Sequence, residues 1–194
     1  MKLKKLFESE YGNNDINLSE NELTSLPSDL PDKVSGDFWC HDNHDNHLTS
    51  LEYCPSHIGG NFSCHHNELT SLEHCPSEVG KGFYCDYNDL TSLEHCPSEV
   101  GGVFYCSNNN LTSLKDVHKQ IKKISGSFGC FENPIKSHIL GLMLVEISGE
   151  IETGLGDGDD VDEILNKWKN QGRHGVLGAQ RELLDLGYDQ LAQL

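Results

Sequence analysis

Apolar and polar positions recur along this chain in a unit of about 21 residues. The word Leu-Thr-Ser-Leu begins at residues 23, 48, 69, 90 and 111, and Phe-x-Cys precedes four of these words and follows the last. One stretch, LTSLEHCPSEVG, opens at Leu69 and again, letter for letter, at Leu90. A unit this short cannot bury its own apolar edge, so it must stack on the next copy. The pattern therefore predicts a solenoid of stacked coils.

Each unit predicts one short strand followed by a return path. Phe and Cys, two residues apart, lie on the same side of a strand and point inward. The leucines of Leu-Thr-Ser-Leu, and then Val79 or Val100, bring the chain back with their side chains inside, while Gly and Pro make the corners. An Asn follows each Phe-x-Cys pair, and we expect these residues to bond the backbone of neighbouring coils as a ladder: Asn43 or Asn46 in one unit, then Asn67, Asn88, Asn109 and Asn133.

The unit G-x-F-x-C-x-x-N-x-L-T-S-L-E-x-C-P-S-x-V-G resembles the leucine-rich repeat, L-x-x-L-x-L-x-x-N/C-x-L, with Phe and Cys in the two strand positions. It is also similar to the Phe-x-Cys-x-x-Asn-x-Leu-Thr-Ser-Leu repeat proteins of tailed bacteriophages, over about residues 15–137. The resemblance implies an α/β repeat fold: a leucine-rich-repeat-type solenoid with short parallel β-strands. It further implies a bacteriophage protein that is made during infection and engages a host protein.

The segments before and after the repeat predict helical caps. Apolar residues at helical spacing begin the chain, and beyond Pro134 the repeat fades into two amphipathic patterns at 159–169 and 176–194. Terminal coils are expected to be atypical because one of their sides faces water. The expected organisation is an N-terminal helical cap at 1–14, the solenoid at 15–137 and a C-terminal helical cap at 138–194.

The charge of the chain restricts its partners. Its formal net charge is −17. Between Val34 and Leu114 there are eleven Asp and Glu residues, and Lys81 is the single Lys or Arg. Such a surface repels nucleic-acid phosphates and anionic lipid and favours a host protein with a basic surface. The chain begins without the apolar segment of a signal peptide, and no apolar run is long enough to span a membrane. We therefore expect a cytoplasmic protein (host cytoplasm, if a phage encodes it) that contacts neither nucleic acid nor a membrane directly; its oligomeric state stays open.

The cysteines and histidines are the residues best suited to chemistry. The eight cysteines recur at one strand position and one corner, where we expect buried, reduced thiols about 5 Å apart, too far for an undistorted disulfide. The segment CHDNHDNH (40–47) is rich in His, and His41 and His65 occupy equivalent positions on adjacent coils, close enough to share an ion. Zinc sites usually show paired ligand clusters, however, and this position becomes Asp86 and Ser107 in the next two coils. We therefore expect a solvated polar face with no metal site and no cofactor, with weak metal binding as the alternative.

Alternation along the strands places aromatic residues on the outward side of the predicted sheet. Exposed aromatic side chains beside polar ones are typical of a protein interface, although Tyr also suits a strand by propensity alone. Glutamates at equivalent positions of successive coils add a column of acid. The predicted binding face comprises Trp39, His41, His65, Tyr84, Asp86, Tyr105, Phe131, Glu73 and Glu94.

The expected function is a non-enzymatic protein–protein interaction module, a phage protein that modulates or inhibits a host protein such as a defence factor. We assign no catalytic residues, and the Gly- and Asp-rich stretch 154–163 fits neither a dinucleotide-binding loop nor a calcium loop. LTSLPSDLP also resembles the repeats of secreted bacterial leucine-rich-repeat ubiquitin ligases, but those carry a nucleophilic Cys beyond the repeats and no Cys follows Cys130. The alternative is an acidic nucleic-acid mimic, whose carboxylate columns about 5 Å apart imitate phosphates and block a DNA-binding host enzyme.

Overall fold

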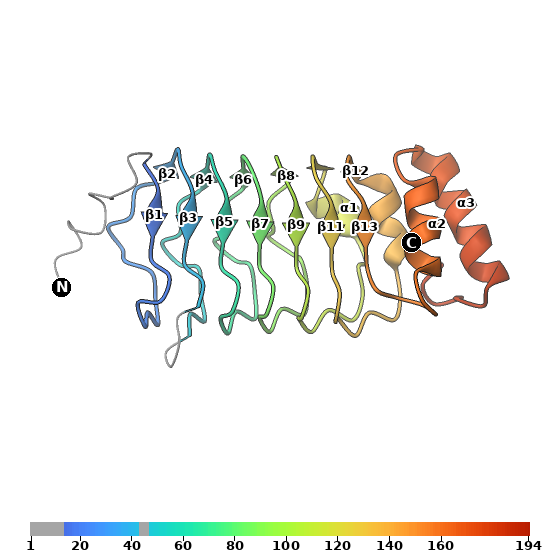
Figure 1. Cartoon of the computed structure of the whole chain (residues 1–194), viewed down its shortest axis with the longest axis horizontal. Helices are drawn as coiled ribbons and strands as arrows, with labels where there is room; N and C mark the ends of the chain where they lie inside the picture. Colours follow the sequence, from blue (N-terminus) through green and yellow to red (C-terminus); the bar gives the residue numbers. More distant parts are fainter. Residues whose placement is uncertain (1–13, 43–46) are drawn as a thin grey trace.

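The computed structural model describes residues 14–42 and 47–194, and it shows a parallel β-solenoid with two helices at its C-terminal end (Figure 1). The coils follow one another along a single axis, so neighbours in sequence are neighbours in space. The expected solenoid with short parallel strands is therefore confirmed. The N-terminal helical cap expected at 1–14 lies, but for its last residue, outside the described residues.

Two parallel sheets run along the stack, and every strand within the described residues is two residues long. The first, here called the Phe sheet, has seven strands in the described part of the chain: β1 (Ile16–Asn17), β3 (Phe38–Trp39), β5 (Phe62–Ser63), β7 (Phe83–Tyr84), β9 (Phe104–Tyr105), β11 (Phe128–Gly129) and β13 (Ile151–Glu152). The second, the Val sheet, has six there: β2 (Lys33–Val34), β4 (His57–Ile58), β6 (Glu78–Val79), β8 (Glu99–Val100), β10 (Lys123–Ile124) and β12 (Glu146–Ile147). The helices are α1 (Val117–Gln120), the 3-10 helix η2 (Ile139–Leu144), α2 (Asp160–Trp168) and α3 (Gly172–Asp185).

A column of phenylalanine rings forms the spine of the interior. The rings of Phe38, Phe62, Phe83, Phe104 and Phe128 are fully buried, and successive centroids lie 5.9, 5.5, 4.8 and 5.5 Å apart. The cysteine that follows each of these strands is buried as well, so the five Phe-x-Cys strands lie side by side as expected. Because each of the three inner rings packs on the rings of two other coils, and each end ring on one, the core is continuous and the coils depend on one another for stability.

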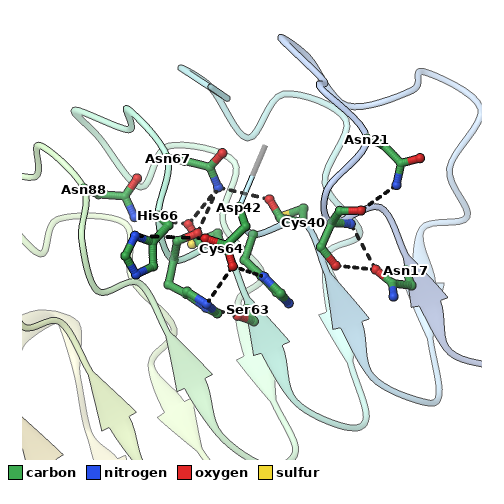
Figure 2. A network of polar contacts seen from close by, with 12 residues as sticks. Asn17, Asn21, Cys40, Asp42, Ser63, Cys64, His66, Asn67 and Asn88 are labelled. Carbon is green, nitrogen blue, oxygen red and sulfur yellow. Dashed lines mark hydrogen bonds and ion pairs between the residues drawn. The ribbon is translucent and has the colours of Figure 1, made fainter. Parts of the chain in front are cut away.

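The expected asparagine ladder is present from Asn67 onward, where it joins each coil to the one before it. Its first expected member, Asn43 or Asn46, lies outside the described residues. The Asn67 side chain accepts the N–H of Leu48 at 3.1 Å and donates to the carbonyl oxygens of Cys40 and Cys64, both at 3.0 Å (Figure 2). The same three contacts recur at the residues in equivalent positions, Asn88, Asn109 and Asn133. One side-chain amide therefore satisfies three backbone groups that strand pairing leaves unpaired inside the stack.

Glycine at the corner between the two sheets lets the coils approach one another. A Cβ on Gly80 would lie 2.2 Å from the carbonyl oxygen of Gly59, and a Cβ on Gly101 would lie 2.0 Å from that of Gly80. No other residue fits these positions without separating the coils, so the requirement for glycine here is steric.

Strand pairing continues past residue 137, where the sequence analysis placed the end of the solenoid. β12 pairs with β10 and β13 pairs with β11, which adds another coil. Ile147, Ile151 and Thr153 are buried there in the positions that Val, Phe and Cys occupy in other coils. The expected boundary was too early because these replacements hide the motif while keeping the inward pattern, and the pairing extends to Glu152.

Helix α2 covers the end of the stack and bonds to its last coil. Three side chains accept hydrogen bonds from backbone N–H groups of this coil. Within the helix, Asp162 accepts from Thr153 and Asn166 from Ile151, both at 2.9 Å. Just beyond the helix, Asn170 accepts from Ile147 at 3.0 Å. These acceptors are spaced by four residues, so they lie on one side of the helix. An open sheet edge invites pairing with another chain, and this arrangement blocks it.

Replacing Asn88 with Ala should lower the free energy of unfolding by about 3 kcal/mol, because the N–H of Leu69 and two carbonyl oxygens lose their partner inside the stack. Urea unfolding followed by circular dichroism measures the change. The matched control is Asn110→Ala, since the exposed Asn110 side chain donates only to the Asp89 carboxylate on the surface; we expect less than about 0.5 kcal/mol there. Equal stability of the two variants would contradict a structural role for the ladder.

Candidate binding face

Seven of the nine expected face residues lie together along the outside of the Phe sheet. Strand register aligns the outward residues as one column: Asn17, Trp39, Ser63, Tyr84, Tyr105, Gly129 and Glu152. His41, His65, Asp86 and Phe131 each follow a strand of this sheet by two residues and so form a second column beside the first. We call these two columns together the aromatic face.

Glu73 and Glu94 belong to a different edge of the coil. Each lies in the turn that leads into the Val sheet, five residues ahead of Glu78 and Glu99 respectively. Both side chains are about two-thirds exposed (68% and 67%) and lie near the rings of His74 and His95. The structure thus separates the expected acidic column from the aromatic one, because the Leu-Thr-Ser-Leu segment carries the chain away from the Phe sheet first.

Three aromatic rings of this face, those of Tyr84, Tyr105 and Phe131, pack over glycines of the backbone. A Cβ on Gly82 would lie 2.6 Å from the Tyr84 ring, and a Cβ on Gly129 would lie 2.7 Å from Tyr105 Cδ1. Gly154 has the same relation to Phe131, at 2.8 Å. Tyr84 and Tyr105 are partly buried over these positions before any partner arrives, which reduces the entropy that binding costs, whereas Phe131 is exposed (40%). These glycines were not part of the predicted face. Their signal in the sequence was a glycine at the register position beside Tyr105 and Phe131, or two residues before Tyr84.

A cluster of histidines and one carboxylate occupies the end of the aromatic face near β3 and β5. The rings of His41 and His65 stack with centroids 4.3 Å apart, as their equivalent positions in the repeat predicted. The carboxylate of Asp42 accepts a hydrogen bond from His41 Nδ1 at 3.0 Å and lies 3.6 Å from His65 Nε2. His66 stacks on Tyr87 at 4.2 Å, which extends the row of rings. Asp42, His66 and Tyr87 are not among the nine residues that the sequence predicted for the face.

Burial and neighbouring charges shift several pKa values on this face. Burial lowers the pKa of His65 to about 4, with a further lowering from His41 that outweighs the opposite effect of Asp42. Burial acts to raise the pKa of Asp42, but the hydrogen bond from His41 and the nearby His65 and His66 lower it overall. Burial raises the pKa of Asp86, although its bond from the Ser107 N–H opposes this, and burial followed by the charge of Glu152 raises the pKa of Tyr105.

Acidic groups dominate the aromatic face, whereas charges alternate on the Val sheet. Asp37, Asp42, Asp86 and Glu152 border the aromatic rings, and Lys81 pairs with Asp37 at 3.8 Å. The outward column of the Val sheet reads Lys33, His57, Glu78, Glu99, Lys123 and Glu146. The Glu78–Glu99 pair is thus bounded by His57 and Lys123 and does not extend into a long line of carboxylates.

The cysteines are unsuited to nucleophilic chemistry. All eight are free thiols, and burial raises the pKa of each of them, that of Cys96 to about 12. A thiol acts as a nucleophile only as the thiolate, which burial disfavours here. The expectation of buried, reduced thiols is confirmed, except that Cys54 and Cys75 are partly exposed.

No family model matches this chain, and no curated protein is significantly similar to it. In the part of the chain that the structure describes, no helix combines the length and apolar composition needed to cross a membrane. Function must therefore be inferred from the geometry and charge of the face itself.

The lowered pKa of His65 predicts its behaviour in a pH titration. Between pH 6.5 and about 4 the unfolded chain binds more protons at this residue than the folded chain, so its contribution makes stability decrease as the pH falls across that window. Histidine ring NMR should show His65 titrating near pH 4, with its signals assigned by their absence in His65→Gln. A His65 midpoint near 6.5 would contradict the burial of this ring.

Proposed function

We propose that this chain is a non-enzymatic protein-binding module of the leucine-rich-repeat type that grips a basic segment of a protein partner with its aromatic face. The observation that carries the proposal is the row of rings, Trp39, Tyr84, Tyr105 and Phe131, on a surface bordered by carboxylates. Three of these rings, those of Tyr84, Tyr105 and Phe131, pack over glycines of the backbone. Aromatic rings next to carboxylates are suited to receive arginine and lysine side chains.

The chemistry of recognition follows from the arrangement of the rings. A guanidinium group stacks on an aromatic ring and pairs with a carboxylate in the same plane, and Arg does both better than Lys. Asp86 lies two residues beyond Tyr84 in the same coil, and Glu152 lies two register positions from Tyr105. Each Tyr therefore has an acid in its own coil or within two coils of it, and aromatic anchors of this kind dominate binding energy at interfaces.

The nature of the partner rests on the resemblance to phage repeat proteins. A phage protein made during infection acts in the host cytoplasm, so the partner proposed is a host protein with a basic surface, such as a defence factor. Binding would modulate or inhibit that protein by covering the basic surface.

Mimicry of nucleic acid is the second candidate, and it has less support. A mimic needs carboxylates in a long regular line, as phosphates are. Glu52, Glu73 and Glu94 form such a line for three coils, but Lys115 holds the equivalent place in the next unit. The Val sheet column is interrupted sooner, by His57 and Lys123.

The proposal is tested by quantitative affinity capture from host lysate, comparing wild type with the double variant Tyr84→Ser/Tyr105→Ser. Serine is native to this register at Ser63, so the fold should accept it. Loss of two anchors should reduce recovery of a specific partner by at least about tenfold, equivalent to about 1.4 kcal/mol. Recovery should also decrease with salt, because the carboxylates are near the surface.

The matched control is Tyr53→His, since His74 and His95 occupy that position in the next coils and Tyr53 lies in the turn before the Val sheet. We expect full recovery with this variant. A partner retained by the Tyr84/Tyr105 variant would place binding elsewhere. A partner displaced by duplex DNA and lost in Glu73→Gln/Glu94→Gln would instead favour the mimic.

A further inference from the structure

The cluster of His41, Asp42 and His65 has the dimensions of a metal site. One ligand atom from each of the three side chains lies within 4.8 Å of the other two. His41 Nδ1 and His65 Nε2 are 3.0 and 3.6 Å from the same carboxylate oxygen, Asp42 Oδ2. In a tetrahedral zinc site with bonds of about 2.0–2.1 Å, neighbouring ligand atoms are roughly 3.3 Å apart. Both contacts to the carboxylate are close to that separation.

A neighbouring side chain orients one of the imidazoles. Ser63 Oγ lies 2.6 Å from His65 Nδ1, and Ser63 is almost fully buried (4% exposed). This contact occupies Nδ1 and leaves Nε2 directed to Asp42. Histidine ligands of metals are typically held in this way by a hydrogen bond to the second ring nitrogen.

The backbone fixes the two halves of the cluster relative to each other. The Asp42 N–H donates to the carbonyl oxygen of His65 at 3.2 Å, immediately beyond the pairing of β3 with β5. The turn at Asp42 is left-handed (φ 49°), but so are the turns at His66 and Tyr87 in the next coils. The backbone of the cluster therefore has the same geometry as other pairs of stacked coils, and the cluster differs from them only in the identity of its side chains. Figure 2 shows Asp42 beside the imidazole of His66.

We propose that His41, Asp42 and His65 bind one divalent ion of the zinc type, with the remaining coordination position open to water. Two imidazoles and a carboxylate bind zinc better than magnesium or calcium, because those two ions favour ligand sets made of oxygen alone. The three side chains are only partly buried (22–30% exposed), so an ion can enter and its open position faces solvent. The site lies on the aromatic face, so a partner's side chain can reach that position.

Binding requires two adjustments of the His41 imidazole. The Nδ1 proton that it donates to Asp42 at 3.0 Å must move to Nε2 so that Nδ1 can bind the ion, and the ring must tilt. The stacked rings of His41 and His65 are only 12° from parallel, so their lone pairs do not converge on one point. Ser63 holds the His65 ring, and we expect the His41 ring to tilt. The sequence favoured no metal site here because the position becomes Asp86 and Ser107 in later coils. Two coils are sufficient, however, since the third ligand comes from the turn beside His41.

The test is titration of the full chain with Zn²⁺ alone, by calorimetry and by long-range ¹H–¹⁵N NMR of the histidine rings. We expect a one-to-one complex with nitrogen shifts at His41 Nδ1 and His65 Nε2. Asp42→Asn keeps the size of the side chain but removes its charge, and it should weaken binding at least about tenfold, as should His65→Gln. The proposed partner is not needed, so failure here leaves the protein-binding proposal intact.

The control is His74→Gln, an exposed histidine outside the cluster, which should leave affinity and stoichiometry unchanged. Circular dichroism confirms that each variant is folded. The proposal is overturned if wild type binds no stoichiometric Zn²⁺, if Asp42→Asn and His65→Gln bind as wild type does, or if the nitrogen shifts occur at other histidines.

Discussion

Every feature of this protein depends on coils that repeat at the spacing of parallel β-strands. Within the stack, each coil donates and accepts backbone hydrogen bonds on both sides, so neighbouring coils must have the same path and the same radius. That requirement explains why fully buried Phe rings, buried Asn amides and corner glycines recur at the same places. A larger or smaller residue in any of these columns disturbs two interfaces at once.

A stack of this kind has ends, and the ends need a different solution. The last strands, β12 and β13, would expose unpaired backbone groups to other chains. Asp162, Asn166 and Asn170 satisfy those groups from helix α2 and nearby, with side chains that imitate the next coil. The helices α2 and α3 then bury their apolar sides on the stack and on each other, which closes the core.

The outward columns are where this chain departs from its own repeat. The core columns hardly vary, but the column beside the Phe strands reads His41, His65, Asp86, Ser107 and Phe131. Such variation has no packing reason, because these side chains lie outside the spine. A rigid frame that presents different chemistry on successive coils is suited to recognition, and both the aromatic face and the histidine cluster arise from it.

Repetition let the sequence determine the interior of the solenoid, because a fixed interval between copies also sets which residues stack. The Phe column, the Asn ladder and the buried thiols could all be predicted for that reason, as could the stacking of His41 on His65. The coil at 146–152 could not, since Ile147, Ile151 and Thr153 preserve burial while losing the motif. Tertiary structure alone decided that Glu73 and Glu94 turn away from Tyr84, and that Asp42 meets two imidazoles from different coils. Those outcomes depend on the direction of each turn and on the rotamer of each side chain. Packing against neighbouring residues determines both, and the spacing of the repeat in the sequence does not specify them.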